Sequence, residues 1–144
     1  MQVHHILKSK ATDAVVTVAP GTPISDVAKV LAEKRIGTVV VSKDGETTIG
    51  VLSERDIVRE LAARGADCLG DTVDTYMTSD VITCSRHDEA DVVLTKMTDG
   101  RFRHMPVVED GKLVGLITLG DVVKARLNEL AMEKSALEGM IMGH

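Results

Sequence analysis

The sequence is nearly without aromatic residues: its 144 residues include one Phe, one Tyr and no Trp. A core must therefore form from aliphatic side chains and Met, and a planar ligand is expected to lie between aliphatic groups. Basic charge is also scarce, because the formal net charge is −5. Proteins that bind nucleic acid normally present a basic face, so this charge balance argues against nucleic acid as a partner.

Cysteine is scarce as well, and long apolar runs are absent. Cys68 and Cys84 have no metal-ligand spacing, and two such thiols are typical of a reducing, cytoplasmic setting. No apolar run approaches the roughly 20 residues that cross a bilayer. His4 and His5 are adjacent but have no further ligands nearby, so no metal site is predicted. We expect a cytoplasmic protein with neither metal nor membrane partner.

An internal repeat organises the chain. The helical apolar spacing of residues 24–31 recurs 66 positions later (90 − 24 = 66) in residues 90–97. β-branched runs at 15–20 and 81–86 precede these helices and predict short strands. Each predicted helix is followed by a strand, an Asp-Gly turn, a returning strand and a second helix. These elements are predicted at 38–42, 44–45, 48–53 and 54–64 in the first half, and at 104–109, 110–111, 112–118 and from 119 onward in the second.

The pattern predicts an α/β fold of two β-α-β-β-α repeats, which pack around a pseudo-two-fold axis because each is too small to bury its own faces. The expected domains are 6–64 and 77–127, joined by a linker at 65–76 and followed by a helical extension at 128–144. Within this scheme Gly65 should end one helix and Gly139 another, and Asp88 should be the N-cap of the helix after it.

Two heptapeptides share one pattern of Gly, two apolar residues, Ser or Thr, two further residues and Asp. They are GVLSERD at 50–56 and GLITLGD at 115–121. Ser/Thr-x-x-Asp is also the capping-box pattern of a helix start, so a single copy would favour a capping role alone. The same turn presents free backbone N–H groups that attract anions, so both roles are compatible. Two copies at equivalent positions favour two related binding sites.

With these motifs the sequence resembles a tandem pair of CBS domains (a Bateman module) in a small stand-alone protein. The Thr-containing first strands and the run RHMPVVEDGKLVG at 103–115 add to the resemblance, which covers residues 6–127. In that family the motif Asp binds the ribose of an adenosine ligand, and the Ser or Thr faces the phosphate or ribose. The motif of one repeat faces the first strand and the start of the second strand of the other repeat.

The resemblance implies two nucleotide-binding sites, each built from both repeats. We expect the first site to bind a phosphorylated adenosine more tightly, because it alone contains arginine donors for a phosphate. Solvated surface positions for Arg55 and Arg103 are the alternative. Adenine would lie against Ile36 and Val39, or Met105 and Pro106, unless these residues only pack in the core. The first site would combine Ser53, Arg55 and Asp56 with Thr83, Arg103, His104 and Pro106, and the second would combine Thr118 and Asp121 with Thr17, Ile36, Gly37 and Thr38.

No nucleophile or proton-transfer pair is visible in the sequence, so we expect a regulatory module without catalysis or catalytic cofactor that senses energy or redox state. AMP is the favoured ligand, followed by ATP and ADP. The alternatives are a sensor of NAD(H) or S-adenosylmethionine, and a purely structural dimer with empty pockets. We also expect a homodimer, with the apolar C-terminal helix and its Met132, Met140 and Met142 in the contact or in packing.

Overall fold

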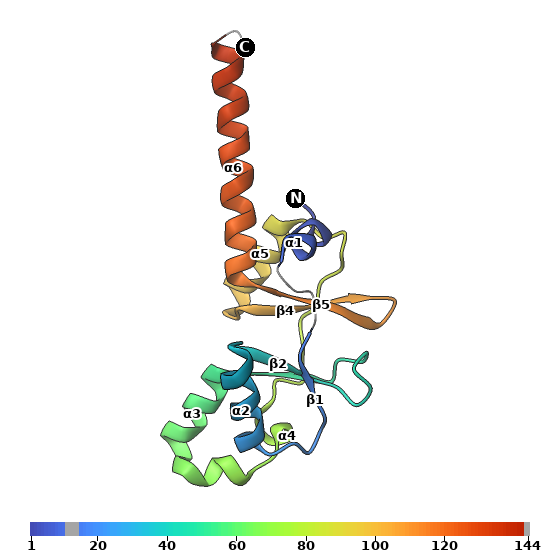
Figure 1. Ribbon diagram of the computed structural model, residues 1–144, viewed down its shortest axis with the longest axis vertical. Helices are drawn as coiled ribbons and strands as arrows, with labels where there is room; N and C mark the ends of the chain where they lie inside the picture. Colours follow the sequence, from blue (N-terminus) through green and yellow to red (C-terminus); the bar gives the residue numbers. More distant parts are fainter. Residues whose placement is uncertain (11–14, 143–144) are drawn as a thin grey trace.

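The computed structural model describes residues 1–10 and 15–142. It contains two α/β units that stack with their sheets toward each other and their helices outside (Figure 1). The predicted architecture of two related α/β repeats is therefore confirmed. Residues 11–14 of the first expected domain and 143–144 of the expected extension lie outside the described residues.

The first repeat is built on a three-stranded sheet of order β1-β2-β3. β1 (Thr17–Val18) pairs in parallel with β2 (Thr38–Val41), and β3 (Gly50–Ser53) pairs antiparallel with β2. Helices α2 (Ile24–Lys34) and α3 (Glu54–Arg64) cover the outer face. The apolar side of α2 contributes the buried residues that its spacing predicts, so local periodicity and tertiary packing agree here.

The second repeat repeats this order with a two-stranded sheet. Its elements are α5 (Ala90–Gly100), β4 (His104–Glu109), β5 (Lys112–Thr118) and α6 (Leu119–Ile141). Both strands have the predicted bounds. The described helices include none that is long and apolar enough to cross a bilayer.

The strand predicted at 81–86 is wrong. Only Cys84 in this run pairs with the sheet, through an isolated parallel bridge to Val107. The chain then turns away, because the Asp88 carboxylate accepts a hydrogen bond of 2.8 Å from the Ser85 N–H. Asp88 therefore stabilises a turn, and its predicted role as an N-cap is also wrong, since α5 begins after Glu89.

The two Asp-Gly turns differ in structure. Asp110 and Gly111 both have positive φ, 50° and 78°, and join β4 to β5 in the predicted tight turn. Asp44 instead organises a longer loop between β2 and β3, where its carboxylate accepts hydrogen bonds of 2.8 Å from the N–H groups of Thr47 and Glu46. These bonds lower the pKa of Asp44 to about 2. The prediction of a tight first hairpin is therefore wrong.

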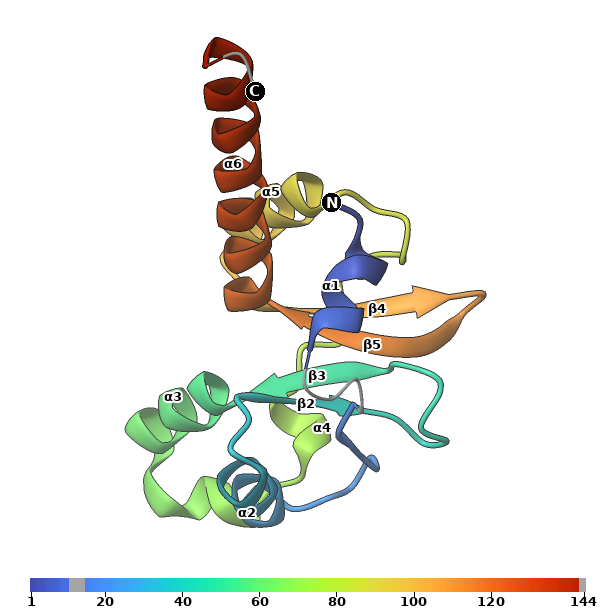
Figure 2. The ribbon, with the colours of Figure 1, turned by 45° about the horizontal axis from the view of Figure 1, so that its top comes forward.

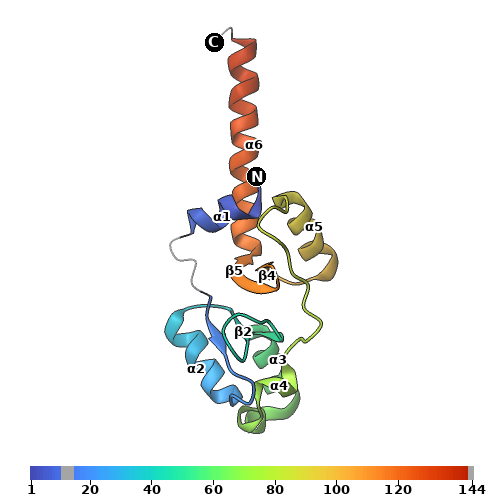
Figure 3. The ribbon, with the colours of Figure 1, turned by 90° about the vertical axis from the view of Figure 1, so that its right-hand side faces the viewer.

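Gly65 and Gly139 were each predicted to end a helix, and the structure tests both predictions. Gly65 follows α3 with a φ of 70°, which confirms its predicted role at a helix end. Gly139 does not end the last helix, because α6 continues to Ile141. The C-terminal part of α6 leaves the second repeat and extends as a single helix (Figure 3).

An N-terminal helix that the sequence did not predict, α1 (Val3–Ser9), packs against the second repeat (Figure 2). The backbone of α1 is hydrogen-bonded to this repeat, because the Val3 N–H donates to the Asp88 carbonyl over 2.9 Å. Val3 and Ile6 are 0% and 2% exposed in the core that includes Met97 and Met105. The first residues of the chain thus complete the hydrophobic core of its second half.

The segment between the repeats packs against the first repeat in the same way that α1 packs against the second. It contains the 3₁₀-helix η1 (Gly65–Gly70) and the short helix α4 (Val73–Tyr76). Val73 is fully buried in the core of the first repeat, as Val3 is in that of the second. Thr72 bridges to Pro23 as Gln2 bridges to Glu89.

This packing explains the glycine that opens each heptapeptide motif. A Cβ atom at Gly50 would lie 2.5 Å from the Met77 sulfur, and one at Gly115 would lie 2.9 Å from a Leu7 methyl group. Both distances are shorter than van der Waals contact, so a larger residue would displace these side chains. Met77 follows α4 and Leu7 belongs to α1, so each motif glycine lies against the equivalent flanking segment of its own repeat.

Candidate functional site: a cleft between the two repeats

Both motif aspartates lie in the first turn of a helix and form capping boxes. In the first motif the Ser53 N–H donates to the Asp56 carboxylate over 2.8 Å, and the Asp56 N–H donates to the Ser53 hydroxyl over 3.2 Å. Thr118 and Asp121 make the same two bonds, at 2.9 and 3.1 Å. The capping role is therefore real in both copies, and it places each carboxylate at a helix N-terminus.

A cleft of about 740 Å³ opens beside the first motif, between the two repeats. It is bounded by the end of β3 and the start of α3, by the chain at 78–82, and by the segment 100–104 that joins α5 to β4. Its lining consists of Gly37, Thr38, Val51, Ser53, Glu54, Arg55, Asp56, Arg59, Thr78, Asp80, Val81, Ile82, Gly100, Arg101, Phe102, Arg103 and His104.

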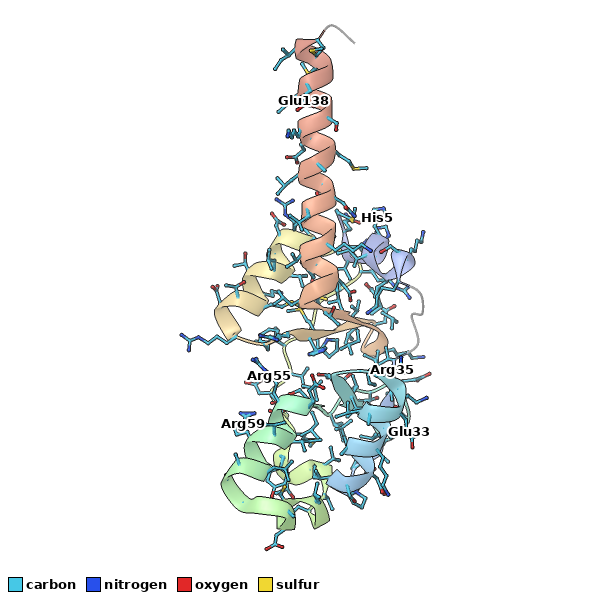
Figure 4. All side chains as sticks on the ribbon, turned by 60° about the vertical axis from the view of Figure 1, so that its left-hand side comes forward. His5, Glu33, Arg35, Arg55, Arg59 and Glu138 are labelled. Carbon is cyan, nitrogen blue, oxygen red and sulfur yellow. The ribbon has the colours of Figure 1, made fainter. Side chains whose placement is uncertain are left out.

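Four arginines and three carboxylates surround this cleft. Arg55 and Arg59 lie on successive turns of α3, with Arg55 nearer the second repeat (Figure 4). Arg59 pairs with the Asp56 carboxylate in an exposed ion pair. Arg101 and Arg103 approach from the second repeat. This arrangement provides guanidinium groups on both sides of the cleft, which suits an anionic ligand.

Arg59 and Arg101 were missed from the sequence. Arg59 follows Arg55 by four residues and Asp56 by three, so it shares their helix face, and this spacing could have identified it. Arg101 gave no comparable signal. It has a left-handed φ of 56° at the end of α5, as Arg35 has at 54° at the end of α2.

The lining of the cleft also includes two ring side chains, His104 and Phe102. His104 is half-buried and lies close to Gly37, where a Cβ atom would be in ordinary van der Waals contact with the imidazole, 3.4 Å from Nε2. Burial lowers the pKa of His104, so the ring is neutral at pH 7. Phe102 also lines the cleft. The expectation that a planar ligand lies between aliphatic groups stays a prediction, and Phe102 adds one aromatic ring to the lining.

Thr38 contributes an unusual polar group to this lining. Its side chain is 3% exposed, and its hydroxyl has no hydrogen-bond partner among the described residues. Buried hydroxyl groups nearly always have a partner, so an unpaired one beside a cleft calls for a bound group or water.

The structure brings together seven of the thirteen predicted site residues. Ser53, Arg55, Asp56, Arg103 and His104 share the cleft as the first predicted site requires, but Gly37 and Thr38, assigned to the second site, line it too. The lining does not include Thr83, Pro106, Thr17, Ile36, Thr118 or Asp121. Of these, Pro106 is buried in β4 and Ile36 packs against the core of the first repeat.

The second motif has a different environment. The Lys10 ammonium donates to the Asp121 carboxylate over 2.9 Å and to the Leu116 carbonyl over 2.9 Å. Burial opposes ionisation of Asp121, but the hydrogen bonds from Lys10 and Thr118 outweigh it and lower the pKa of Asp121. Both side chains of the ion pair are 24% exposed.

The equivalence of the two helices that flank the motifs explains this difference. Val3 corresponds to Val73, so Lys10 corresponds to Asp80, seven residues further along in each segment. Asp80 lines the cleft beside Asp56, whereas Lys10 neutralises Asp121. The equivalent position of the flanking segment is thus acidic near the first motif and basic at the second, although Asp56 also has Arg59 as a cationic partner.

No metal centre is formed by the described residues, in which no three His, Cys, Asp or Glu side chains are placed to bind one ion. His4 and His5 lie on α1 with their ring centroids 3.9 Å apart. Cys68 and Cys84 are buried free thiols, and burial raises the pKa of Cys84 to about 12.

The fold and the cleft define a class of protein: a pair of related α/β repeats that encloses a polar site between a helix N-terminus and the facing repeat. A profile of the CBS domain matches residues 5–63 and 73–128. The chain therefore belongs to the CBS-domain family and contains a pair of these domains.

The chain is also similar to individual known proteins. A 17.7 kDa protein of Acidianus ambivalens is 33% identical over 124 residues, which are 85% of this chain and 74% of that protein. A CBS-domain protein from Agrobacterium tumefaciens has a TM-score of 0.83 and 41% identity, covering 88% of this chain and 99% of the other.

Two similar structures contain adenosine compounds. A CBS-domain protein from Pyrobaculum aerophilum was solved with AMP; it has a TM-score of 0.78 and 30% identity, covering 92% of this chain and 99% of the other. A CBS domain pair solved with 5′-methylthioadenosine and S-adenosyl-L-methionine has a TM-score of 0.78 and 25% identity, covering 90% and 98%.

Proposed function

We propose that this protein is a regulatory module without catalytic activity that binds an adenine nucleotide, AMP in preference to ATP or ADP, in the cleft beside Asp56. The observation that carries the proposal is the cleft itself, which combines a carboxylate at a helix N-terminus with arginines from both repeats. The AMP complex of the Pyrobaculum protein supports the choice of ligand.

The side chains of the cleft divide into three chemical groups. Asp56 accepts hydrogen bonds from the vicinal hydroxyls of the ribose, and Arg59 pairs with the same carboxylate. Arg55 and Arg103 bind the phosphate, together with the N–H groups at the start of α3. The base lies against the apolar lining of the cleft, which includes Ile82 and Phe102.

Regulation follows from the position of this site between two units. A ligand that touches both repeats shifts their relative orientation only as far as it binds one arrangement better than another. The shift then passes to a second copy of the chain in a homodimer, or to a regulated protein. NAD(H) contains the same adenosine and extends further along the cleft, so it is the second candidate together with S-adenosylmethionine.

A thermal-unfolding screen with AMP, ADP, ATP, NADH and S-adenosylmethionine tests the proposal. A ligand present at 100 times its Kd adds about 2.7 kcal/mol to the stability of the folded state, so AMP should raise the Tm most. A larger shift with NADH or S-adenosylmethionine would favour the second candidate. No shift with any compound would indicate a structural module with empty pockets, and turnover of a nucleotide would contradict the absence of catalysis.

The Lys10–Asp121 ion pair predicts that the two motifs bind unequally. A ribose at Asp121 must displace the ammonium of Lys10, whose side chain is only 24% exposed, whereas the Arg59 side chain that pairs with Asp56 is 66% exposed and is free to move aside. Titration calorimetry should find about one nucleotide per chain in the native protein and about two in Lys10→Ala, because the competing cation is removed. Lys8→Ala, an exposed change on the same segment, is the matched control. An unchanged stoichiometry for Lys10→Ala would refute the competition.

A further inference from the structure

The solvent-facing side of α6 carries an apolar stripe that the second repeat does not cover. Its side chains are exposed, with Leu127 at 61%, Leu137 at 60% and Ile141 at 84%. They are spaced alternately by four and three residues, which is the spacing of a coiled-coil seam. The stripe consists of Val123, Leu127, Leu130, Leu137 and Ile141, with Lys134 at the remaining position.

The stripe lies on a different side of α6 from the body of the protein. Val122 and Ala125 are buried against the second repeat. At about 100° per residue, their side of the helix is roughly a third of a turn away from the stripe. The stripe is therefore open along its whole length, and α6 projects away from both repeats (Figures 1 and 3).

We propose that this stripe binds the same stripe of a second copy in an antiparallel coiled coil. The inference rests on the homodimer proposed above and names its interface. The spacing of the stripe is the same when read from either end, because Val123 and Ile141 are equally far from position 132. An antiparallel pair centred there places Leu127 of one copy against Leu137 of the other, and Val123 against Ile141.

Charge favours the antiparallel over the parallel arrangement. In a parallel pair the two Lys134 side chains would meet in the seam, and Glu133 would approach Glu138 of the second copy. In the antiparallel pair Lys134 lies beside Leu130, so its stem packs while its ammonium reaches water.

The edges of the antiparallel pair are also better matched. Lys124 of one copy faces Glu138 of the second copy on both sides of the two-fold axis, which gives two attractive contacts. The one like-charge approach, between the two Glu133 side chains, lies at the exposed edge, where water screens it. The two bodies then lie at opposite ends of the paired helices.

The interface is tested by the mass of the full chain in solution at micromolar concentration. The native protein should have at least twice the 15.4 kDa mass of one chain, and Leu130→Lys should halve that mass by opposing Lys134 of the second copy. Met132→Lys is the matched control, since Met132 is 68% exposed but lies on the opposite side of α6. A monomeric native protein would refute the homodimer itself, and an unchanged mass for Leu130→Lys would refute only this interface.

The orientation is tested by disulfide cross-linking. Leu127→Cys and Leu137→Cys are made separately; the native Cys68 and Cys84 are buried. Mixing the two proteins under oxidation should give a mixed cross-linked dimer, with little cross-linking of either protein alone. Efficient cross-linking of each variant with itself would show a parallel pair and overturn the antiparallel assignment.

Discussion

Replacing Asp56 with alanine is expected to weaken AMP binding about 100-fold, or about 3 kcal/mol, because two hydrogen bonds from the ribose to a charged acceptor are lost. Arg59 would also lose its partner, which leaves an extra cation near the phosphate and limits the loss. The Kd from titration calorimetry, measured on native and variant proteins at the same ionic strength, gives the size of the effect.

Asp121→Ala is the matched control for this experiment. It removes the same capping contact from a helix N-terminus, so it has a similar structural cost to Asp56→Ala. It should leave AMP affinity within a few-fold of native, because Asp121 is already paired with Lys10 and does not line the cleft. A larger loss of affinity for Asp121→Ala than for Asp56→Ala would show that the principal site is at the second motif.

Ile6→Ala is expected to lower the free energy of unfolding by about 3 kcal/mol and the Tm by roughly 10 °C. Ile6 belongs to α1 but is 2% exposed in the core of the second repeat. The truncation leaves a cavity between the N-terminal helix and the elements that cover it. Urea unfolding followed by circular dichroism measures the change.

His5→Ala is the control for the stability experiment. His5 precedes Ile6 on the same helix and is exposed, so the substitution tests helix formation without emptying the core. It should change the free energy of unfolding by less than about 0.5 kcal/mol. Equal effects of the two substitutions would mean that α1 contributes no core packing to the second repeat.

The N-terminal helix also links the two proposed properties of the protein. α1 packs on the second repeat through Val3 and Ile6, and the same segment ends in Lys10 at the second motif. The residues that stabilise this repeat therefore hold the cation that competes for Asp121. A change in α1 packing should alter nucleotide stoichiometry as well as stability.

Much of the fold was predictable because its determinants are local. The apolar spacing of α2 and α5, the strands at 104–109 and 112–118 and the turn at Asp110–Gly111 each depend on neighbours within a few residues. The repeat added the one long-range conclusion that the sequence supports, since two copies of a unit too small to fold alone must share a surface.

Local patterns also misled where a nearby side chain redirected the backbone. Asp88 ended the run at 81–86 after a single bridge, and Asp44 replaced a tight turn with a loop. In both cases an Asp carboxylate accepts hydrogen bonds from nearby backbone N–H groups. These bonds compete with strand pairing, which forms few backbone hydrogen bonds at these short segments.

The sequence by itself determined two α/β repeats, two capped helix starts with an aspartate in each, and a net acidic surface. Only the tertiary structure decided that residues 3–9 belong to the second repeat, that Lys10 meets Asp121, and that Arg59 and Arg101 join the cleft. The physical reason is that hydrophobic spacing specifies which face of an element is buried but not which distant element covers it. Charged residues on flexible side chains follow no such periodic pattern in the sequence, so the partner of each is decided by where the packed backbone places it.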